Sequence, residues 1–335
     1  MKIQIVARPF VVVCALFLAV TASAQVTASV PYTVSTFATG VPGTYFQPDS
    51  IAVLGNHIFI GYGNGVAKDG SDGKSSTIVE YKMNGDIVTT LSVKGHNDGL
   101  RVNPQTKQLW ALQNEDGNPN LAIIDPTSGT QTVYTFAPTA HGGGYDDIAF
   151  RGTDVFLSAS NPSNNPNASQ AVVRATISGS TVNVTEVLNA SAMATDVPTA
   201  TPQTLNLQDP DSMIFDQFGD LVLDSQADSE LIIVHHLGFT DQSVYHLGLT
   251  LGGSAVQVDD TIFATSTHGT ILVSDRDAPS GGVVYAISKD AFSPGAAYTA
   301  TPTSVGSLNF DTGVVTNVVS GMVSPHGMAF IPSKQ

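Results

Sequence analysis

The sequence predicts an all-β chain folded as a six-bladed β-propeller with four-stranded antiparallel blades. Two patterns predict this fold: a short motif that returns along the chain, and strand-like segments that follow most of its copies. The acidic composition agrees with them, since the chain has 24 Asp against four Glu. Asp favours turns and strand ends over helices, so this imbalance favours a β protein.

The motif starts with an acidic or imidazole side chain, passes through a small or polar residue and enters a short apolar run. Neighbouring copies lie 48 or 49 residues apart, or 65 to 67 where the chain carries insertions. This period is typical of propeller blades. The leading residues of the six copies are Asp49, Asp98, Asp146, Asp211, Asp259 and His326.

Each of the first four motif copies is followed by three further strand-like segments, which completes a four-stranded blade. The fifth unit continues through residues 270–276 and 282–288, and the sixth motif is followed at once by the end of the sequence. We expect the N-terminal strand at 32–40 to complete the last blade and close the ring. Either residues 289–311 supply the rest of that blade, or the ring is less regular than six equal blades.

Three segments interrupt the strand pattern, at residues 160–169, 190–208 and 289–304. They are rich in Pro, Asn, Ala and Thr and lack the periodicity of strands, so we expect them to be loop insertions on the faces of the propeller. No domain boundary is visible, and residues 25–335 are therefore predicted to form a single propeller domain.

Residues 1–24 have the pattern of a signal peptide. Lys2 and Arg8 precede an apolar run at 10–20, and Ala22-Ser23-Ala24 offers a cleavage site. The only cysteine, Cys14, falls in this segment, so a processed chain would contain no disulfide bond. We expect an exported protein, periplasmic or extracellular, without a membrane span, because no later apolar run approaches the length of roughly 20 residues that a bilayer requires.

The formal net charge is −15 at pH 7, and removal of Lys2 and Arg8 with the signal peptide makes it −17. Nucleic-acid binding depends on basic contacts to phosphate, so a nucleic-acid partner is not expected. The acidity either keeps an exported protein soluble or attracts cations to a site.

The leading residues of the motif are candidate ligands of a divalent cation: Asp49, Asp98, Asp146, Asp211, Asp259 and His326. If each motif forms an innermost strand, these side chains converge on one mouth of the central channel. Carboxylates held so close together must take up protons or share a cation. Oxygen ligands suit Ca²⁺ or Mg²⁺, and the imidazole would admit Zn²⁺. The alternative is structural, since an Asp before a strand often caps a turn.

Three further histidines, His96, His141 and His268, lie near expected loop ends. They could contribute to a three-histidine zinc site or be ordinary loop residues. Asp98, His268 and His326 are the candidate catalytic residues, because a carboxylate and imidazoles next to a metal can act as acid and base.

The fourth unit, PDSMIFDQFGDLVLDSQADSELIIV at 210–234, resembles the repeats of NHL-type propellers and of the gluconolactonase/senescence-marker-protein and streptogramin-lyase-like families. This resemblance implies a small-molecule substrate and a divalent metal held by Asp211, Asp49 and Asp98. The lyases pair histidine and acid near a metal, a role for which His268 and His326 could correspond. The glutamate of the lactonase group has no counterpart, because the first glutamate, Glu80, falls in an expected third strand.

Two functional hypotheses follow. One is a metal-dependent hydrolase or lyase that acts on a small ester, lactone or sugar acid at the channel mouth. The other is a non-catalytic exported propeller that binds a protein or glycan through its face loops. Metal analysis separates the two, since a binding scaffold needs no open-coordination ion.

Overall fold

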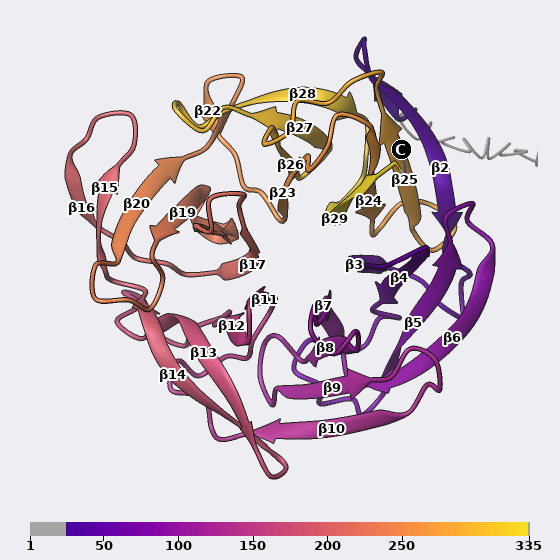
Figure 1. The fold of residues 1–335 in the computed structure, drawn as a ribbon, viewed down its shortest axis with the longest axis horizontal. Coiled ribbons are helices and arrows are strands. Elements are labelled where there is room, and N and C mark those ends of the chain that lie inside the picture. Colours follow the sequence, from indigo (N-terminus) through magenta and orange to yellow (C-terminus); the bar gives the residue numbers. More distant parts are fainter. Residues whose placement is uncertain (1–24, 334–335) are drawn as a thin grey trace, which may run out of the picture.

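The structure is a computed structural model that describes residues 25–333, and the predicted signal peptide at 1–24 lies outside them. Six blades surround a central channel, as predicted (Figure 1). Within the described residues the single helical segment is the 3₁₀ turn η1 (Gln226–Asp228).

The first four blades each use four consecutive strands of the ring, as the motif spacing predicts. Blade one contains β3 (Pro48–Leu54), β4 (His57–Tyr62), β5 (Ser75–Lys82) and β6 (Ile87–Lys94). Blade two contains β7 (Asn97–Val102), β8 (Leu109–Gln113), β9 (Asn120–Ile124) and β10 (Gln131–Phe136). Blade three contains β11 (Ile148–Arg151), β12 (Asp154–Ser158), β13 (Gln170–Ser178) and β14 (Thr181–Asn189). Blade four contains β17 (Pro210–Phe215), β18 (Leu221–Ser225), β19 (Glu230–His235) and β20 (Ser243–Gly248).

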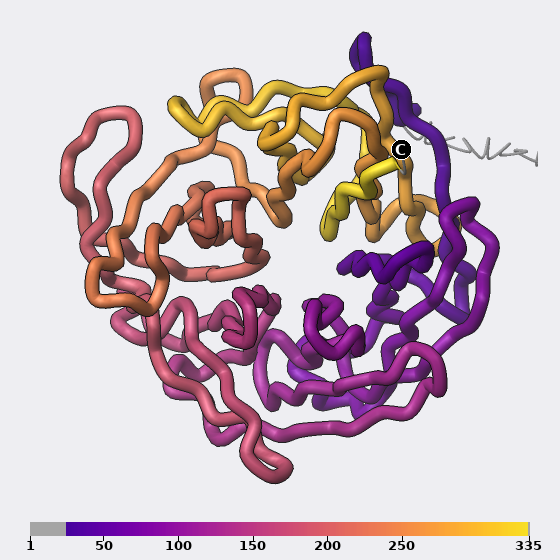
Figure 2. The backbone as a smooth tube through the Cα atoms, in the orientation of Figure 1, coloured from indigo at the N-terminus to yellow at the C-terminus, as the bar shows by residue number. Residues whose placement is uncertain are grey.

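The last two blades exchange strands, which the motif spacing does not predict. Blade five contains β23 (Thr261–Phe263), β26 (Ala297–Thr301), β27 (Ser304–Leu308) and β28 (Val314–Ser320). Blade six contains β29 (Pro325–Pro332), β24 (Gly269–Asp275), β25 (Val283–Ser288) and the N-terminal β2 (Thr33–Thr39). The chain therefore leaves blade five after β23, builds two strands of blade six, and returns (Figure 2).

This topology corrects three expectations and confirms one. Residues 270–276 and 282–288 belong to blade six and not to the fifth unit. Residues 289–304 are not a loop insertion, because β26 and the start of β27 lie within them, and residues 289–311 serve blade five. The N-terminal strand closes the ring in the last blade, where β2 pairs with β25, as predicted.

Additional segments cover the outer edges of several blades. Residues 190–208 form the hairpin β15 (Met193–Asp196) and β16 (Pro202–Thr204), which extends blade four at its rim and does not lie on a face. The short strands β21 (Thr250–Leu251), β22 (Ser254–Ala255) and β1 (Thr27–Ala28) extend blade five. Strands β10 and β14 pair in parallel and join blades two and three.

The hydrophobic core lies between the blades. Six clusters of buried apolar side chains fill the six seams, one for each pair of neighbouring blades. The cluster between blades six and one contains residues of β2, β3 and β24, so the closing seam is packed like the others. Each blade thus buries one face of its sheet on each neighbour, as sheets stacked around an axis require.

A shared irregularity places the motif residues. In β3, β7, β17 and β29 the pairing with the second strand skips the leading motif residue and the residue after it, which form a β-bulge. Bulges re-aim side chains and are common beside functional sites. In these four strands the residue after the leading one is small because it touches the next blade: a Cβ at Gly99 would lie 2.1 Å from the Asp146 carbonyl oxygen, and one at Gly327 would lie 2.7 Å from that of Asp49.

No helix in residues 25–333 is both long enough and apolar enough to cross a membrane.

Candidate functional site

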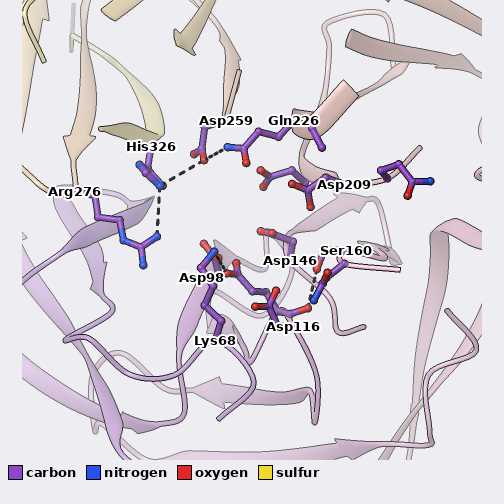
Figure 3. A pocket seen from close by; sticks show the side chains of 15 residues that line it. Lys68, Asp98, Asp116, Asp146, Ser160, Asp209, Gln226, Asp259, Arg276 and His326 are labelled. Atoms are coloured by element: carbon purple, nitrogen blue, oxygen red, sulfur yellow. Dashed lines mark hydrogen bonds and ion pairs between the residues drawn. The ribbon is translucent and has the colours of Figure 1, made fainter. Parts of the chain in front are cut away.

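One mouth of the central channel is a polar cavity of about 280 Å³ (Figure 3). All six blades contribute to its wall, through the leading motif positions and through the connections that follow the second strands. Its lining residues are Lys68, Asp98, Glu115, Asp116, Asp146, Ser160, Asn161, Gln208, Asp209, Asp211, Gln226, Ala227, Asp259, Arg276 and His326.

The structure brings the six predicted metal-site residues together at this mouth. Five of them, Asp98, Asp146, Asp211, Asp259 and His326, line the cavity. Asp49 lies just behind the wall, where it is 3% exposed and its Oδ2 is 3.5 Å from Nη1 of Arg276.

The carboxyl groups of the mouth destabilise one another's ionised forms. Burial, followed by the charge of Asp98, raises the pKa of Asp49 to about 8. Burial is also the main cause that raises the pKa of Asp209 to about 6. The same two effects, burial and neighbouring carboxylates, raise the pKa values of Asp146, Asp211 and Asp259. Such a cluster favours either bound protons or a bound cation.

His326 is the imidazole of the ring. Its Nδ1 lies 2.9 Å from the Ser324 carbonyl, which can only accept, so Nδ1 carries the hydrogen and Nε2 is left with a lone pair. Nε2 lies 3.5 Å from Arg276 Nη1 and 3.8 Å from Asp259 Oδ1. Gln226 donates to the same Asp259 oxygen at 2.8 Å.

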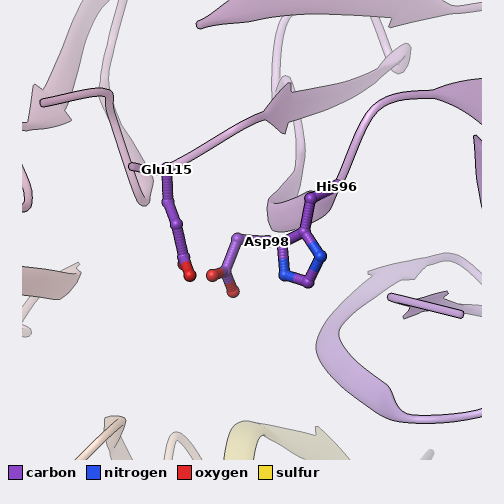
Figure 4. A group of neighbouring side chains, drawn as sticks. All are labelled: His96, Asp98 and Glu115. Atoms are coloured by element: carbon purple, nitrogen blue, oxygen red, sulfur yellow. The ribbon is translucent and has the colours of Figure 1, made fainter. Parts of the chain in front are cut away.

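A second group of ligand atoms lies in the wall beside Asp98 (Figure 4). His96, Asp98 and Glu115 each offer one nitrogen or oxygen atom, and these atoms lie within 4.8 Å of one another. Within residues 25–333, no other three His, Cys, Asp or Glu residues meet that condition. The Lys68 ammonium group contacts the Glu115 carboxylate and is the nearest counter-charge.

The structure does not bring His268 to this mouth, so its prediction as a catalytic partner of His326 is wrong. His268 directly precedes β24, whose first residue Gly269 pairs with Pro332 at the far end of β29, whereas His326 lies at the mouth end. It is exposed on the opposite face, and its Nδ1 contacts the Asp290 carbonyl.

His141 is a structural residue. It is fully buried and donates from Nε2 to the Gly144 carbonyl at 2.6 Å, while Gln170 donates to its Nδ1 at 3.2 Å. The three-histidine site therefore does not form, and His96 alone of those histidines lies beside a motif acid.

A second layer of charges lies deeper in the channel. Arg101 donates to Asp147 at 2.5 Å, and Asp147 also accepts the Met213 backbone N–H of the following blade at 2.8 Å. Asp260 accepts the Met328 N–H in the same way at 2.6 Å. In these two motif copies the residue after the leading one is thus a carboxylate that joins adjacent inner strands, which is a structural role.

No family model matches the chain, and no curated protein matches it in sequence. Similarity to solved structures is confined to shape. A protein of unknown function from Bacteroides caccae covers 86% of this chain and 88% of its own, with 8% identity and a TM-score of 0.53. A periplasmic gluconolactonase from Pseudomonas aeruginosa covers 90% and 99%, with 12% identity and a TM-score of 0.49.

A virginiamycin B lyase from Staphylococcus aureus covers 91% of this chain and 89% of its own, with 10% identity and a TM-score of 0.48. The likeness to the Bacteroides caccae protein concerns the fold alone, and the two matches with TM-scores below 0.5 carry no further conclusion. At these identities the likeness carries no residue roles to this chain.

Proposed function

We propose that the protein is an exported, divalent-metal-dependent hydrolase or lyase that acts on a small ester, lactone or sugar acid in the cavity at the channel mouth. The observation that carries this proposal is the convergence of the motif acids and His326 on one polar cavity. A scaffold that only binds a partner would not need buried carboxyl groups at its axis, because each raises the free energy of the folded state unless it is neutralised.

The donors present fit a divalent cation. Seven carboxyl groups line the cavity, Asp98, Glu115, Asp116, Asp146, Asp209, Asp211 and Asp259, against two cationic side chains, Lys68 and Arg276. Within residues 25–333, the buried Asp49 Oδ2 also has no hydrogen-bond partner. Asp98 is the central ligand of the proposal, since it lines the cavity and its charge helps to raise the pKa values of the other four ring acids, Asp49, Asp146, Asp211 and Asp259. A bound cation would polarise a substrate carbonyl or activate water.

The chain's own residues can bind and orient a hydroxylated substrate. The wall is polar apart from Ala227, so the cavity suits a substrate rich in hydroxyl groups. Among the described residues, the Arg276 guanidinium has only the two 3.5 Å contacts to His326 and Asp49, which leaves donors for a carbonyl or carboxylate oxygen. His326 Nε2 can accept a proton, and Asp259 lies close enough to stabilise the resulting cation.

The test is hydrolysis of a panel of aldonolactones and simple esters by the purified protein, stripped with a chelator and then supplied with Mg²⁺, Ca²⁺, Mn²⁺ or Zn²⁺. We expect turnover that requires a divalent cation and falls about 100-fold or more in His326→Asn, in line with the loss of a positioned acid–base group. His236→Asn is the matched control, because His236 is exposed and far from the mouth. Metal-independent turnover, or no turnover with any cation, would count against the proposal.

Export is a separate part of the proposal and rests on the pattern of residues 1–24. N-terminal sequencing of the protein from a secreting host should find Gln25 at the start. Recovery of the uncleaved chain from the cytoplasm would overturn this part without affecting the proposed site.

A further inference from the structure

We propose that His96, Asp98 and Glu115 form a transition-metal site in the wall of the cavity, which takes Mn²⁺, Co²⁺ or Zn²⁺ in preference to Ca²⁺. The inference deepens the proposed function by naming the ligands of its cation. It rests on that function only for the reaction, because metal binding can be measured without a substrate.

The three ligands come from separate segments that the fold brings together. His96 lies in the connection between β6 and β7, Asp98 in the bulge of β7, and Glu115 in the connection between β8 and β9. Their ligand atoms lie within 4.8 Å of one another, a spacing that a single ion can bridge after small side-chain shifts. An imidazole with two carboxylates is a donor set typical of Mn²⁺, Fe²⁺ or Zn²⁺, whereas Ca²⁺ prefers oxygen ligands alone.

The imidazole of His96 is prepared to act as a ligand. Its side chain is fully buried, and its Nδ1 lies 3.0 Å from the Val66 carbonyl, which can only accept a hydrogen bond. The hydrogen is therefore on Nδ1, and the lone pair is on Nε2. Nε2 is buried and has no hydrogen-bond partner within the described chain. A backbone carbonyl that fixes the tautomer in this way is the usual support of a metal-binding histidine.

The backbone around the site is fixed by reciprocal hydrogen bonds. The His96 N–H donates to the Asn114 side chain at 2.9 Å, and the Asn114 N–H donates to the His96 carbonyl at 2.8 Å. The Glu115 carbonyl accepts from the Gly144 N–H at 2.8 Å and from Ser160 Oγ at 2.9 Å. Gly144 is required there, because a Cβ would lie 2.5 Å from that carbonyl oxygen. Such support holds ligands in place before the ion arrives.

Lys68 occupies the position of a competing cation. Its ammonium group contacts the Glu115 carboxylate, and Lys68 belongs to the connection between β4 and β5, a surface segment separate from the other three. A metal ion bound by Glu115 would have to displace this ammonium group. The structure therefore predicts opposite effects on metal affinity from two substitutions, a loss when a ligand is removed and a gain when Lys68 is neutralised.

The experiment is calorimetric titration of the purified, chelator-stripped protein with Mn²⁺, Zn²⁺ and Ca²⁺. The absorption spectrum of the Co²⁺ form is recorded as well. His96→Gln should weaken Mn²⁺ binding by at least about 100-fold, since removal of an outer support alone typically costs 10–100-fold. Glu115→Gln should weaken it as well. Lys68→Met should tighten Mn²⁺ binding about tenfold, because a cation a few ångström away shifts such equilibria by one order of magnitude or more.

The gain in Lys68→Met keeps the test decisive if His96→Gln folds poorly, since a folding defect cannot raise affinity. Asp211→Asn is the matched control in the axial ring and should change Mn²⁺ affinity about threefold at most, through screened attraction only. If Asp211→Asn loses Mn²⁺ binding while His96→Gln binds normally, the ion is held by the axial ring of acids, and the inference is overturned. Tight Mn²⁺ binding with all three expected changes, but no turnover of any lactone or ester, would refute the proposed function and leave this site intact.

Discussion

The leading motif residue and the residue after it explain how single residues build the mouth. The bulge turns the leading side chain of β3, β7, β17 and β29 toward the cavity, and the small residue after it lets the next inner strand approach. Two serines also bond across seams between blades. Ser50 Oγ of the motif donates to the Asp98 carbonyl, and Ser274 Oγ, in the second strand of blade six, donates to the Asp49 carbonyl at 2.6 Å. The same few residues thus determine both the orientation of the leading side chains and the packing of adjacent inner strands.

Gly99→Ala should therefore destabilise the protein. The new Cβ would lie 2.1 Å from the Asp146 carbonyl oxygen and 3.0 Å from the Asp147 Cα, and both are backbone atoms that cannot move aside alone. We expect the free energy of unfolding to decrease by about 1–3 kcal/mol, the usual cost of overpacking. Gly117→Ala is the control, since its Cβ would meet only the Asp69 Cβ at 3.8 Å. Thermal unfolding of both variants checks this, and equal melting temperatures would contradict it.

At the same scale, the sequence predicted the leading acids and missed their neighbours. The acids recur with a fixed period, so one pattern finds all of them. Glu115, Gln226 and Arg276 lie in connections of unequal length that share no motif. Each of them follows the end of a buried second strand by one or two residues, which is the signal that could have found them. The sequence pattern groups His96 only with other histidines, because its closeness to Glu115 depends on how the β6–β7 and β8–β9 connections meet.

At the scale of the elements, the sequence predicted the inner strands well and the assignment of the outer ones less well. Residues 270–276 and 282–288 have the strand pattern of the fifth unit and stand in its place in the sequence. The sheet that a strand joins is decided by long-range pairing, here of β24 with β29 and of β25 with β2. Apolar alternation does not contain that information, because every blade needs the same pattern.

The hairpin at the rim of blade four is held by a titratable group. His246 in β20 contacts Asp196, at the end of β15, at 3.1 Å and Glu230, at the start of β19, at 2.6 Å. Burial alone would lower the pKa of His246, but the hydrogen bonds and charges of Glu230 and Asp196 outweigh it and raise that pKa. The protonated imidazole therefore stabilises this edge.

His246→Gln should accordingly be costly at low pH and nearly harmless at high pH. Because the folded pKa is raised, the contribution of His246 is complete below its unfolded value of about 6.5 and is lost as the pH rises through the folded value. The difference in melting temperature between the parent and His246→Gln should be larger at pH 5.5 than at pH 9. The exposed His236, paired with Asp241, provides the control His236→Gln, which should have little effect at either pH.

At the scale of the whole molecule, two opposing terms meet at the channel axis. The six seam clusters bury apolar surface all around the ring and favour closure. Closure in turn gathers the motif acids in a small volume, where burial raises the pKa values of Asp49, Asp146, Asp209, Asp211 and Asp259. Ionisation of these acids therefore destabilises the folded ring, and a bound cation can offset this cost by attracting their negative charges.

This balance predicts how stability depends on pH. An acid whose folded pKa is raised contributes most below its unfolded value, about 3.9 for Asp, and this contribution is lost as the pH rises through the folded value. For the mouth acids that window extends to about 8, the value of Asp49. In the presence of a chelator, the melting temperature should therefore fall between about pH 4.5 and pH 8.

A divalent cation should remove much of this decrease in melting temperature. It binds the ionised carboxylates, and so stabilises the folded state most at pH 8, where these groups carry the most negative charge. We expect Mn²⁺ or Mg²⁺ to raise the melting temperature by several degrees at pH 8 and by little at pH 4.5. Na⁺ at matched ionic strength separates this effect from general screening of the acidic surface, which acts on all exposed charges alike. A cation effect of equal size at both pH values would contradict binding at the mouth acids, since more of these acids are ionised at pH 8 than at pH 4.5.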